Sequence, residues 1–266
     1  MLGLGVSLIL VLMTTSVSAK TNFDKPDLQR EKRMASEVED AVLDGEVIYL
    51  KDSSLESHEF MAIDQEPEGD VKGAVIILHG RGFHPNWEDA IFPLRTQLPA
   101  QGWRTLSLQM QVLKKTAKYN DYMPLFPLAG NRIEAGIAYL KEQGIDNIIL
   151  LAHSCGAHMA MEWIRSKEGK VDKMISAYIG AGMGATDYKQ PMEQPFPLAK
   201  MTIPVLDIYG ENEYPAVLRM APGRKAMMKK AGNKKSKQVV VPKANHYFTD
   251  QGDAFVESVV GWLETL

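Results

Sequence analysis

An apolar run that ends on a serine between small residues most constrains how this chain can fold. The run Asn147-Ile-Ile-Leu-Leu-Ala-His-Ser-Cys-Gly-Ala157 predicts a buried strand that ends at Ser154 and is followed at once by a helix. It has the pattern of a nucleophile elbow, G-x-S-x-G, written here as Ala152-His153-Ser154-Cys155-Gly156. The turn strains the serine backbone and crowds the strand against the helix, so small residues must flank it. Ala152 in place of glycine adds a methyl group, which such a turn tolerates.

Length and charge limit the classes of protein. A chain of 266 residues with 45% hydrophobic and 24% charged residues can bury the core of one α/β domain. The formal net charge of −3 gives no general attraction to nucleic acid. One basic cluster lies on an expected helix and its exit turn, and we interpret it as a solvated face, with an anionic envelope partner as the alternative. It contains Arg224, Lys225, Lys229, Lys230, Lys234, Lys235 and Lys237.

The first 19 residues resemble an export signal. Residues 8–13 are apolar, and Val17-Ser18-Ala19 has the small side chains of a cleavage site, although positive residues near Met1 are missing. The segment is too short to span a membrane comfortably. We therefore expect a signal peptide over residues 1–19, one domain over residues 20–266 without a membrane span, and a periplasmic or secreted location. The oligomeric state is left open.

Apolar strands and amphipathic helices alternate along most of the chain. This alternation predicts a mostly parallel sheet with helices on both faces. Besides the elbow strand, strands are expected at residues 46–50, 58–63, 74–78, 104–108, 174–179, 205–209 and 238–241. Helices are expected at residues 28–43, 87–101, 128–143 and 254–266, and directly after the elbow.

Two long segments interrupt this alternation, at residues 111–127 and 182–204. Both follow expected strands and are rich in Met, Tyr, Phe and Pro. Open α/β folds bind their ligands at the carboxyl edge of the sheet, where these segments would lie. They are candidates for the walls or the lid of a substrate pocket, and plain surface loops are the alternative.

A serine nucleophile needs a base to take its proton and an acid to orient that base. His246 lies directly after the last expected strand, which would deliver it to the same sheet edge as Ser154. For the acid we favour Glu213, which follows the strand at residues 205–209. Asp207 is the second choice, because a side chain in mid-strand would face the helices instead of His246.

Two backbone amides are expected to stabilise the developing oxyanion. One belongs to Cys155, the residue after the serine. The other belongs to Arg81 in His79-Gly80-Arg81-Gly82, where glycines allow close approach of a substrate. We expect His79 to hold this loop, and the histidine spacing predicts no metal site. Cys155 is the chain's single cysteine, so no internal disulfide can form, and its thiol is a disfavoured alternative nucleophile.

The order of four features along the chain resembles the α/β-hydrolase superfamily. They are the His79-Gly80 turn, the elbow at Ser154, the turn ending at Glu213 and the late His246. The segments Leu78-His-Gly-Arg-Gly-Phe-His-Pro-Asn-Trp87, Pro93-Leu-Arg95 and Gly102-Trp-Arg-Thr-Leu-Ser-Leu-Gln-Met110 are similar to the DUF3530 branch of this superfamily. The resemblance implies the α/β-hydrolase fold, an eight-stranded sheet with one antiparallel strand, and a Ser-His-acid triad.

These residues predict a serine hydrolase that acts on a small ester or related acyl substrate without a cofactor. The reaction would pass through an acyl-enzyme intermediate. Two alternatives stay open, because fold alone does not fix function. One is an exported binding or scaffold protein that keeps the fold without turnover, and the other is an acyltransferase that uses the same residues.

Overall fold

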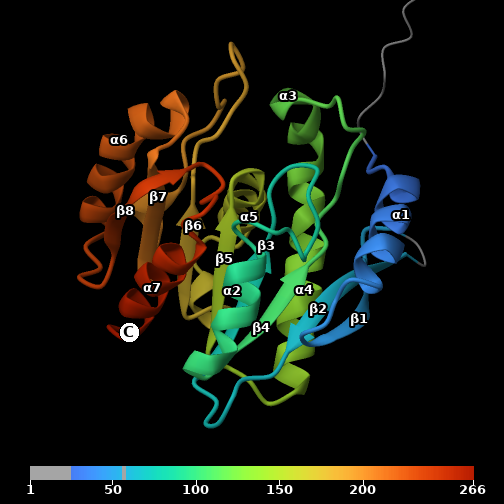
Figure 1. Ribbon diagram of the computed structural model, residues 1–266. Coiled ribbons are helices and arrows are strands. Elements are labelled where there is room, and N and C mark those ends of the chain that lie inside the picture. The colour runs from blue at the N-terminus through green and yellow to red at the C-terminus, as the bar shows by residue number, and fades with distance from the viewer. Residues whose placement is uncertain (1–24, 56–57) are drawn as a thin grey trace, which may run out of the picture.

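The computed structural model describes residues 25–55 and 58–266, so the expected signal at residues 1–19 lies outside the described part. One eight-stranded sheet has the order β1-β2-β4-β3-β5-β6-β7-β8 (Figure 1). Only β2 runs against its neighbours, β1 and β4; the other neighbouring pairs are parallel. The mostly parallel sheet expected from the sequence is confirmed. The strands are β1 Glu46–Lys51, β2 Glu59–Gln65, β3 Gly73–Leu78, β4 Trp103–Leu108, β5 Ile148–His153, β6 Ala177–Ala181, β7 Val205–Asn212 and β8 Lys237–Asn245.

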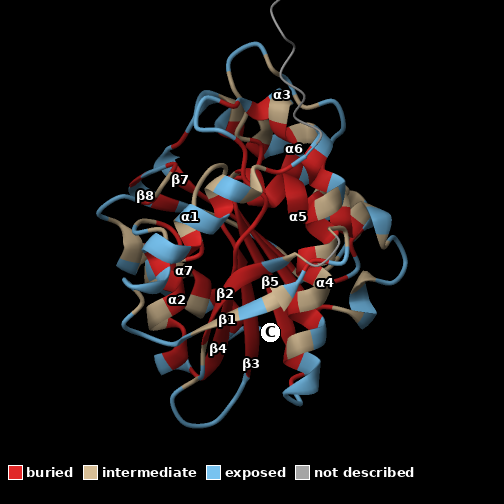
Figure 2. Ribbon diagram, turned by 90° about the vertical axis from the view of Figure 1, so that its right-hand side faces the viewer, coloured by how far each residue is buried: buried red, intermediate tan, exposed pale blue. Residues whose placement is uncertain are grey.

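Helices cover both faces of the sheet. They are α1 Leu28–Glu39, α2 Phe92–Gln97, α3 Tyr119–Tyr122, α4 Phe126–Glu142, α5 Cys155–Ser166, α6 Pro215–Ala231 and α7 Gly252–Leu263. In Figure 1, α2 and α7 lie in front of the sheet, with α4 and α5 behind it. Because both faces are covered, β3 and β5 are buried along their whole length, and the strands form the buried centre of Figure 2.

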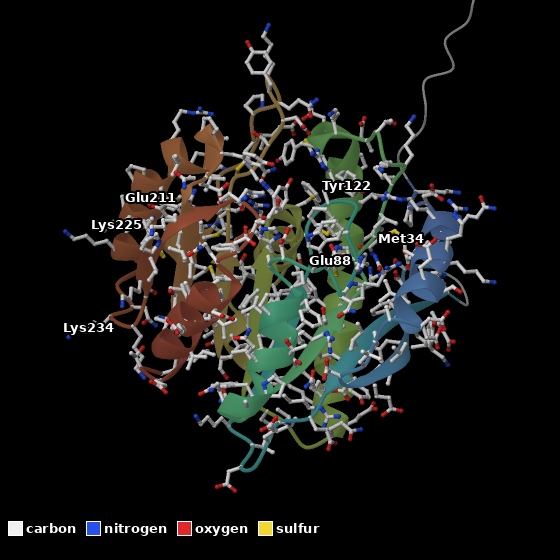
Figure 3. The ribbon with its side chains drawn as sticks, in the orientation of Figure 1. Met34, Glu88, Tyr122, Glu211, Lys225 and Lys234 are labelled. Carbon is white, nitrogen blue, oxygen red and sulfur yellow. The ribbon has the colours of Figure 1, made fainter. Side chains whose placement is uncertain are left out.

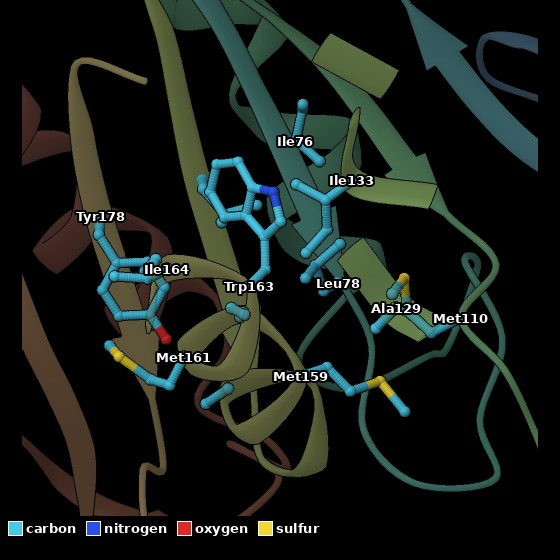
Figure 4. Close-up of a cluster of buried hydrophobic side chains, with 14 of the residues drawn as sticks. Ile76, Leu78, Met110, Ala129, Ile133, Met159, Met161, Trp163, Ile164 and Tyr178 are labelled. Carbon is cyan, nitrogen blue, oxygen red and sulfur yellow. The ribbon is translucent and has the colours of Figure 1, made fainter. Parts of the chain in front are cut away.

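Alternate residues of each central strand enter different cores. Val75 and Ile77 of β3 join the cluster beneath α2 and α7, whereas Ile76 and Leu78 join the cluster beneath α4 and α5. In the second cluster the indole of Trp163 on α5 packs beside this strand (Figure 4). Truncating a buried Trp to Ala typically costs about 3–5 kcal/mol. The packing therefore holds α5, and with it the elbow, firmly against the sheet.

Three expectations about local structure are wrong. The helix expected over residues 87–101 is reduced to α2, followed by a 3-10 turn at Pro99–Gln101. Pro93 lacks an N–H group and is tolerated only in the first turn of a helix, so α2 begins at Phe92. The strand expected at residues 174–179 lies later, as β6, because it forms its pairs with β5 over Ala177–Ala181.

The third wrong expectation concerns the segment at residues 111–127, where the sequence predicts neither a strand nor a helix. It contains the short helix α3, whose first turn is closed by the Asp121 carboxylate, and this carboxylate accepts the Lys118 amide at 2.7 Å. Within residues 25–55 and 58–266, no helix has both the length and the apolar character needed to cross a bilayer.

Candidate active site

The elbow has the strained geometry that its small residues predicted. Ser154 stands between β5 and α5 with φ 56° and ψ −118°, a conformation that costs a non-glycine residue on the order of 1–3 kcal/mol. Its amide donates to the carbonyl oxygen of Ala181 on β6 at 2.8 Å, which fixes the turn. A Cβ atom at Gly156 would lie 2.6 Å from the His79 carbonyl oxygen, so only glycine lets α5 approach β3 this closely.

Ser154, His246 and Glu213 form a continuous hydrogen-bonded chain. The Nε2 atom of His246 lies 2.7 Å from Ser154 Oγ, and its Nδ1 atom lies 2.6 Å from Glu213 Oε1. Glu213 directly follows β7 and His246 directly follows β8, so two adjacent parallel strands deliver them to one edge. With Nδ1 donating to the carboxylate, Nε2 is left to accept the serine hydroxyl proton.

The Glu213 side chain is fully buried and held in place. Its Oε1 atom also accepts the Tyr214 amide at 2.7 Å. The exposed fractions of the Glu213 and His246 side chains are 0% and 2%. Water therefore competes little for the bond between them, which favours a fixed orientation of the imidazole ring.

Asp207, the second candidate for the acid, faces a different partner. It lies within β7, and its Oδ2 atom accepts from Arg224 Nε of α6 at 2.9 Å and from Gln238 Nε2 at 2.7 Å. Burial raises the pKa of Asp207, against the attraction of the Arg224 guanidinium. The structure therefore does not bring Asp207 to His246.

The interpretation of Arg224 as part of an exposed basic cluster is wrong. Arg224 is 1% exposed. The buried residues of α6 are Val217, Ala221, Arg224 and Met228, which recur at helical spacing on the inner face. The lysines of that cluster are exposed.

The two residues expected to supply the oxyanion donors face a common cavity. Arg81 and Cys155 line the same cavity as Ser154. Among the residues that the structure describes, neither backbone amide donates a hydrogen bond to another residue. Both N–H groups therefore remain available to a ligand.

The Cys155 thiol is buried, and burial raises its pKa to about 12. A thiol with this pKa is protonated at neutral pH. This disfavours the alternative that the cysteine is the nucleophile.

Buried histidines support the loops around the serine. His79 Nδ1 donates to the Gly80 carbonyl oxygen at 2.7 Å, and its Nε2 accepts the Met110 amide at 2.9 Å. His153 Nε2 donates to the carbonyl oxygen of His246 at 2.9 Å. Burial lowers the pKa of both His79 and His153 to about 3, so both are neutral and act as fixed hydrogen-bonding groups. His84 lines the cavity.

Sequence reasoning missed two residues in contact with His246. A Cβ atom at Gly182, which has φ +62°, would lie 2.9 Å from His246 Cε1. The ring of Tyr214 stacks on the imidazole of His246. Gly182 carries a signal in the sequence, since a glycine directly after a buried strand indicates a close approach of backbone. For Tyr214 the sequence holds no such signal apart from its position next to Glu213.

An ion pair that the sequence does not indicate joins three segments around the site. The guanidinium of Arg81 contacts the carboxylate of Asp187, which lies 106 positions later in the chain. Asp187 also accepts the Tyr119 amide at 2.7 Å. The loop after β3, the segment at residues 111–127 and the segment at residues 182–204 are thereby tied together.

A cavity of about 1430 Å³ opens over Ser154 and His246. Both long segments contribute walls, through residues 114–122 and 185–191. Helix α1 adds a wall that the sequence did not predict. Within the described ranges, no group of three or more His, Cys, Asp or Glu side chains could hold a metal ion.

Comparison with known protein families assigns the sequence of this chain to one of them. The model of the family described as "Protein of unknown function (DUF3530)" matches residues 13–123 and 128–265. A search of curated protein sequences finds no match to the chain.

Several solved structures are similar to this one. Est1E from Butyrivibrio proteoclasticus is 15% identical with a TM-score of 0.60, over 82% of this chain and 98% of that one. An alpha-beta serine hydrolase homologue from Coxiella burnetii is 17% identical with a TM-score of 0.60, over 83% and 98%. Dienelactone hydrolase from Anabaena variabilis is 14% identical with a TM-score of 0.62, over 83% and 96%. At such identities the likeness establishes the fold alone, and together with the family match it shows that this chain belongs to the DUF3530 family and has the α/β-hydrolase fold.

Proposed function

We propose that this protein is a serine hydrolase that cleaves an ester or related acyl bond. The hydrogen-bonded chain from Ser154 Oγ through His246 to Glu213 carries the proposal. A serine, a histidine and a buried carboxylate at these distances are the groups that acyl transfer to serine requires. The strained elbow at Ser154 supports the same reading, because the strain has no evident role in stabilising the fold.

In the first half of the reaction, Ser154 Oγ attacks the carbonyl carbon while His246 Nε2 takes the hydroxyl proton. Glu213 stabilises the imidazolium that forms. The Cys155 and Arg81 amides donate to the negative carbonyl oxygen. When the tetrahedral intermediate collapses, the bond to the alcohol breaks and His246 gives its proton to the departing oxygen.

In the second half, water attacks the acyl-enzyme and gives its proton to His246. The carbonyl carbon forms a bond to the water oxygen, and the bond to Ser154 Oγ breaks. The proton then returns to Ser154, and a carboxylic acid leaves. No step requires a cofactor.

The relatives support an acyl substrate. A structure of Est1E has been described with ferulic acid bound, and another relative is named a dienelactone hydrolase. The cavity at Ser154 has room for a small molecule of this size, and aromatic residues including Tyr214 and Tyr247 line it. These observations favour a small acyl-bearing molecule over a large polymer.

Labelling with a fluorophosphonate probe tests the proposal. Purified protein lacking residues 1–19 should form one adduct by intact mass, on the peptide that contains Ser154. The Ser154→Ala and His246→Ala variants should form none. The proposal would be overturned if the folded protein formed no adduct under conditions in which the probe labels a control hydrolase. That result would favour a binding protein without turnover. Acyl transfer would be favoured if Ser154 is labelled but the acyl group of an ester substrate is released only when an alcohol is added as acceptor.

We further propose that the protein is exported. The proposal rests on the apolar run and small residues within residues 1–19. Expression of the full chain in a Gram-negative bacterium should yield a periplasmic protein whose N-terminus is Lys20. An uncut protein in the cytoplasmic fraction would contradict it.

A further inference from the structure

The wall of the cavity over Ser154 has a charge opposite to that of the whole chain. Of the described residues that line it, eight are Lys or Arg and three are Asp or Glu, an excess of five positive charges. The whole chain has a formal charge of −3. A concave surface lined by charge of one sign concentrates ligands of the opposite sign.

Two of the three acidic residues on the wall are already engaged. Asp187 pairs with Arg81 and accepts the Tyr119 amide. The side chain of Asp27 caps α1 by accepting the Arg30 amide at 2.9 Å. The third, Glu37, is exposed. Asp187 also lies 4.0 Å from Lys118 Nζ. Counted over the residues that the structure describes, the wall keeps its excess of positive charge.

Arg30 is the cation best placed to hold a ligand. Its half-buried guanidinium contacts the carbonyl oxygen of Leu113 and donates at 3.0 Å to that of Gly82, in the loop that carries Arg81. Within the described part of the chain, Arg30 forms no ion pair with a carboxylate. Two carbonyl contacts orient the guanidinium beside the candidate oxyanion loop and leave further N–H donors free.

Four exposed cations extend the positive charge around the cavity. They are Arg33 on α1, Lys115, Lys189 and Arg219 on α6. Across residues 25–55 and 58–266, none of the four pairs with a carboxylate. They come from four separate segments of the chain, so sequence position alone does not explain why they meet at one cavity.

From this arrangement we propose that the substrate is an anionic ester, which carries a carboxylate or phosphate besides the bond that is cleaved. The Arg30 guanidinium binds this group, and the surrounding lysines and arginines attract it from solution. The inference rests on the proposed hydrolase function and narrows its substrate class. A guanidinium that is held rigidly and only partly solvated binds an anion better than a mobile surface lysine does.

Two matched chromogenic esters test the inference. The 4-nitrophenyl monoester of adipic acid ends its acyl chain in a carboxylate, and 4-nitrophenyl hexanoate ends a chain of equal length in a methyl group. We expect a kcat/KM for the adipate ester at least tenfold above that for the hexanoate ester, after subtraction of the enzyme-free rate. Arg30→Gln should lower this ratio at least tenfold.

A second variant guards against structural damage, because Arg30 also contacts two loops. The double variant Lys115→Gln/Lys189→Gln removes two exposed charges at the cavity and should lower the ratio severalfold. Lys225→Gln/Lys234→Gln removes the same charge from α6 and its exit turn. Figure 3 shows Lys225 and Lys234 on the opposite flank from Met34 and Tyr122, two residues that line the cavity. This control should keep the ratio of the unmodified protein.

Equilibrium binding to the Ser154→Ala variant separates failure of this inference from failure of the proposed function. By calorimetry, the variant should bind the adipate ester at least tenfold more tightly than the hexanoate ester. If the esters bind equally and are hydrolysed at equal rates, the anionic substrate is refuted and the hydrolase function stands. If the adipate ester binds more tightly but Ser154 neither labels nor turns over, the anion site stands and the hydrolase function is refuted.

Discussion

The ring of Tyr214 lies over the imidazole of His246, with centroids 4.3 Å apart and planes inclined by 28°. The Tyr214 hydroxyl is tied to that of Tyr247 at 2.8 Å. The aromatic ring thus covers one face of the imidazole and limits its rotation. Since small displacements of a reacting group carry large costs in rate, this contact makes a prediction about turnover.

Tyr214→Ala should lower kcat on the order of tenfold by freeing the His246 ring. Tyr214→Phe keeps the stacked ring and loses only the hydroxyl bond, so it should stay within about twofold of the parent. Steady-state kinetics with 4-nitrophenyl butyrate measure both. Equal losses in the two variants would show that the hydroxyl, and not the stacking, is what matters.

Glu213 and Asp207 should respond to substitution in different ways. Glu213→Gln removes the charge that orients and stabilises His246, and kcat should fall about 10³–10⁴-fold with little change in stability. Asp207→Asn leaves the Arg224 guanidinium buried without its carboxylate, which should cost about 3–5 kcal/mol of folding free energy. Its folded fraction should keep most of its activity. Rate assays and urea unfolding of both variants decide the matter, and the reverse pattern would reassign the acid.

Gly182→Ala should inactivate the protein without unfolding it. The added methyl would lie 2.9 Å from His246 Cε1 and 3.0 Å from its Nδ1, and the positive φ disfavours any side chain. The imidazole must move away from Glu213, so kcat should fall at least 100-fold. Circular dichroism checks the fold. Gly144→Ala serves as the control, because Gly144 also has a positive φ, but beyond its chain neighbours no described atom lies within 4 Å of the new methyl.

The Cys155 thiol should be inert. Its raised pKa, about 12, keeps it protonated at neutral pH, so iodoacetamide should neither modify nor inhibit the folded protein at pH 7.5. Cys155→Ala should retain activity within a few fold, since the expected oxyanion donor is the backbone amide. Rapid loss of activity on alkylation, absent in Cys155→Ala, would point to a thiol nucleophile instead.

Acid should destabilise the fold through its buried histidines. Burial lowers the pKa of His158 to about 4, against about 6.5 in the unfolded chain. The folded state favours the neutral ring, so its stabilising contribution is complete above pH 6.5 and is lost as the pH falls towards 4. Each such histidine should lower the free energy of unfolding by about 1.4 kcal/mol per pH unit in that window.

His158→Gln tests the histidine linkage directly. Glutamine can still donate to the Ala185 carbonyl oxygen, which His158 Nε2 contacts at 3.2 Å, but it does not titrate. Urea unfolding between pH 6.5 and 4.5 should show a shallower loss of stability in this variant than in the parent. Identical slopes would mean that His158 takes up its proton in the folded state.

The local pattern of the chain was enough to predict much of the fold and the chemistry-bearing residues. Unbroken apolar strands such as residues 74–78 can be stable only between two layers of helices, so the layered sheet follows from them. The small residues on both sides of Ser154 indicate the strained turn, because such a turn requires them. Glu213 and His246 each follow an expected strand, and parallel strands end at one sheet edge. These are short-range constraints, which a sequence displays directly.

Tertiary structure alone decided the pairings that depend on residues far apart in the chain. Asp207 lies within β7, where Arg224 of α6 packs inward and binds its carboxylate. Glu213 lies just past the end of β7 and meets His246 there. The Arg81–Asp187 contact joins two loops of irregular conformation. Arg30 lies on α1, but the carbonyl groups that orient it at the cavity belong to two such loops. The hydrophobic periodicity of the sequence does not predict the course of such loops, because that course is set by the packing of the elements that they connect.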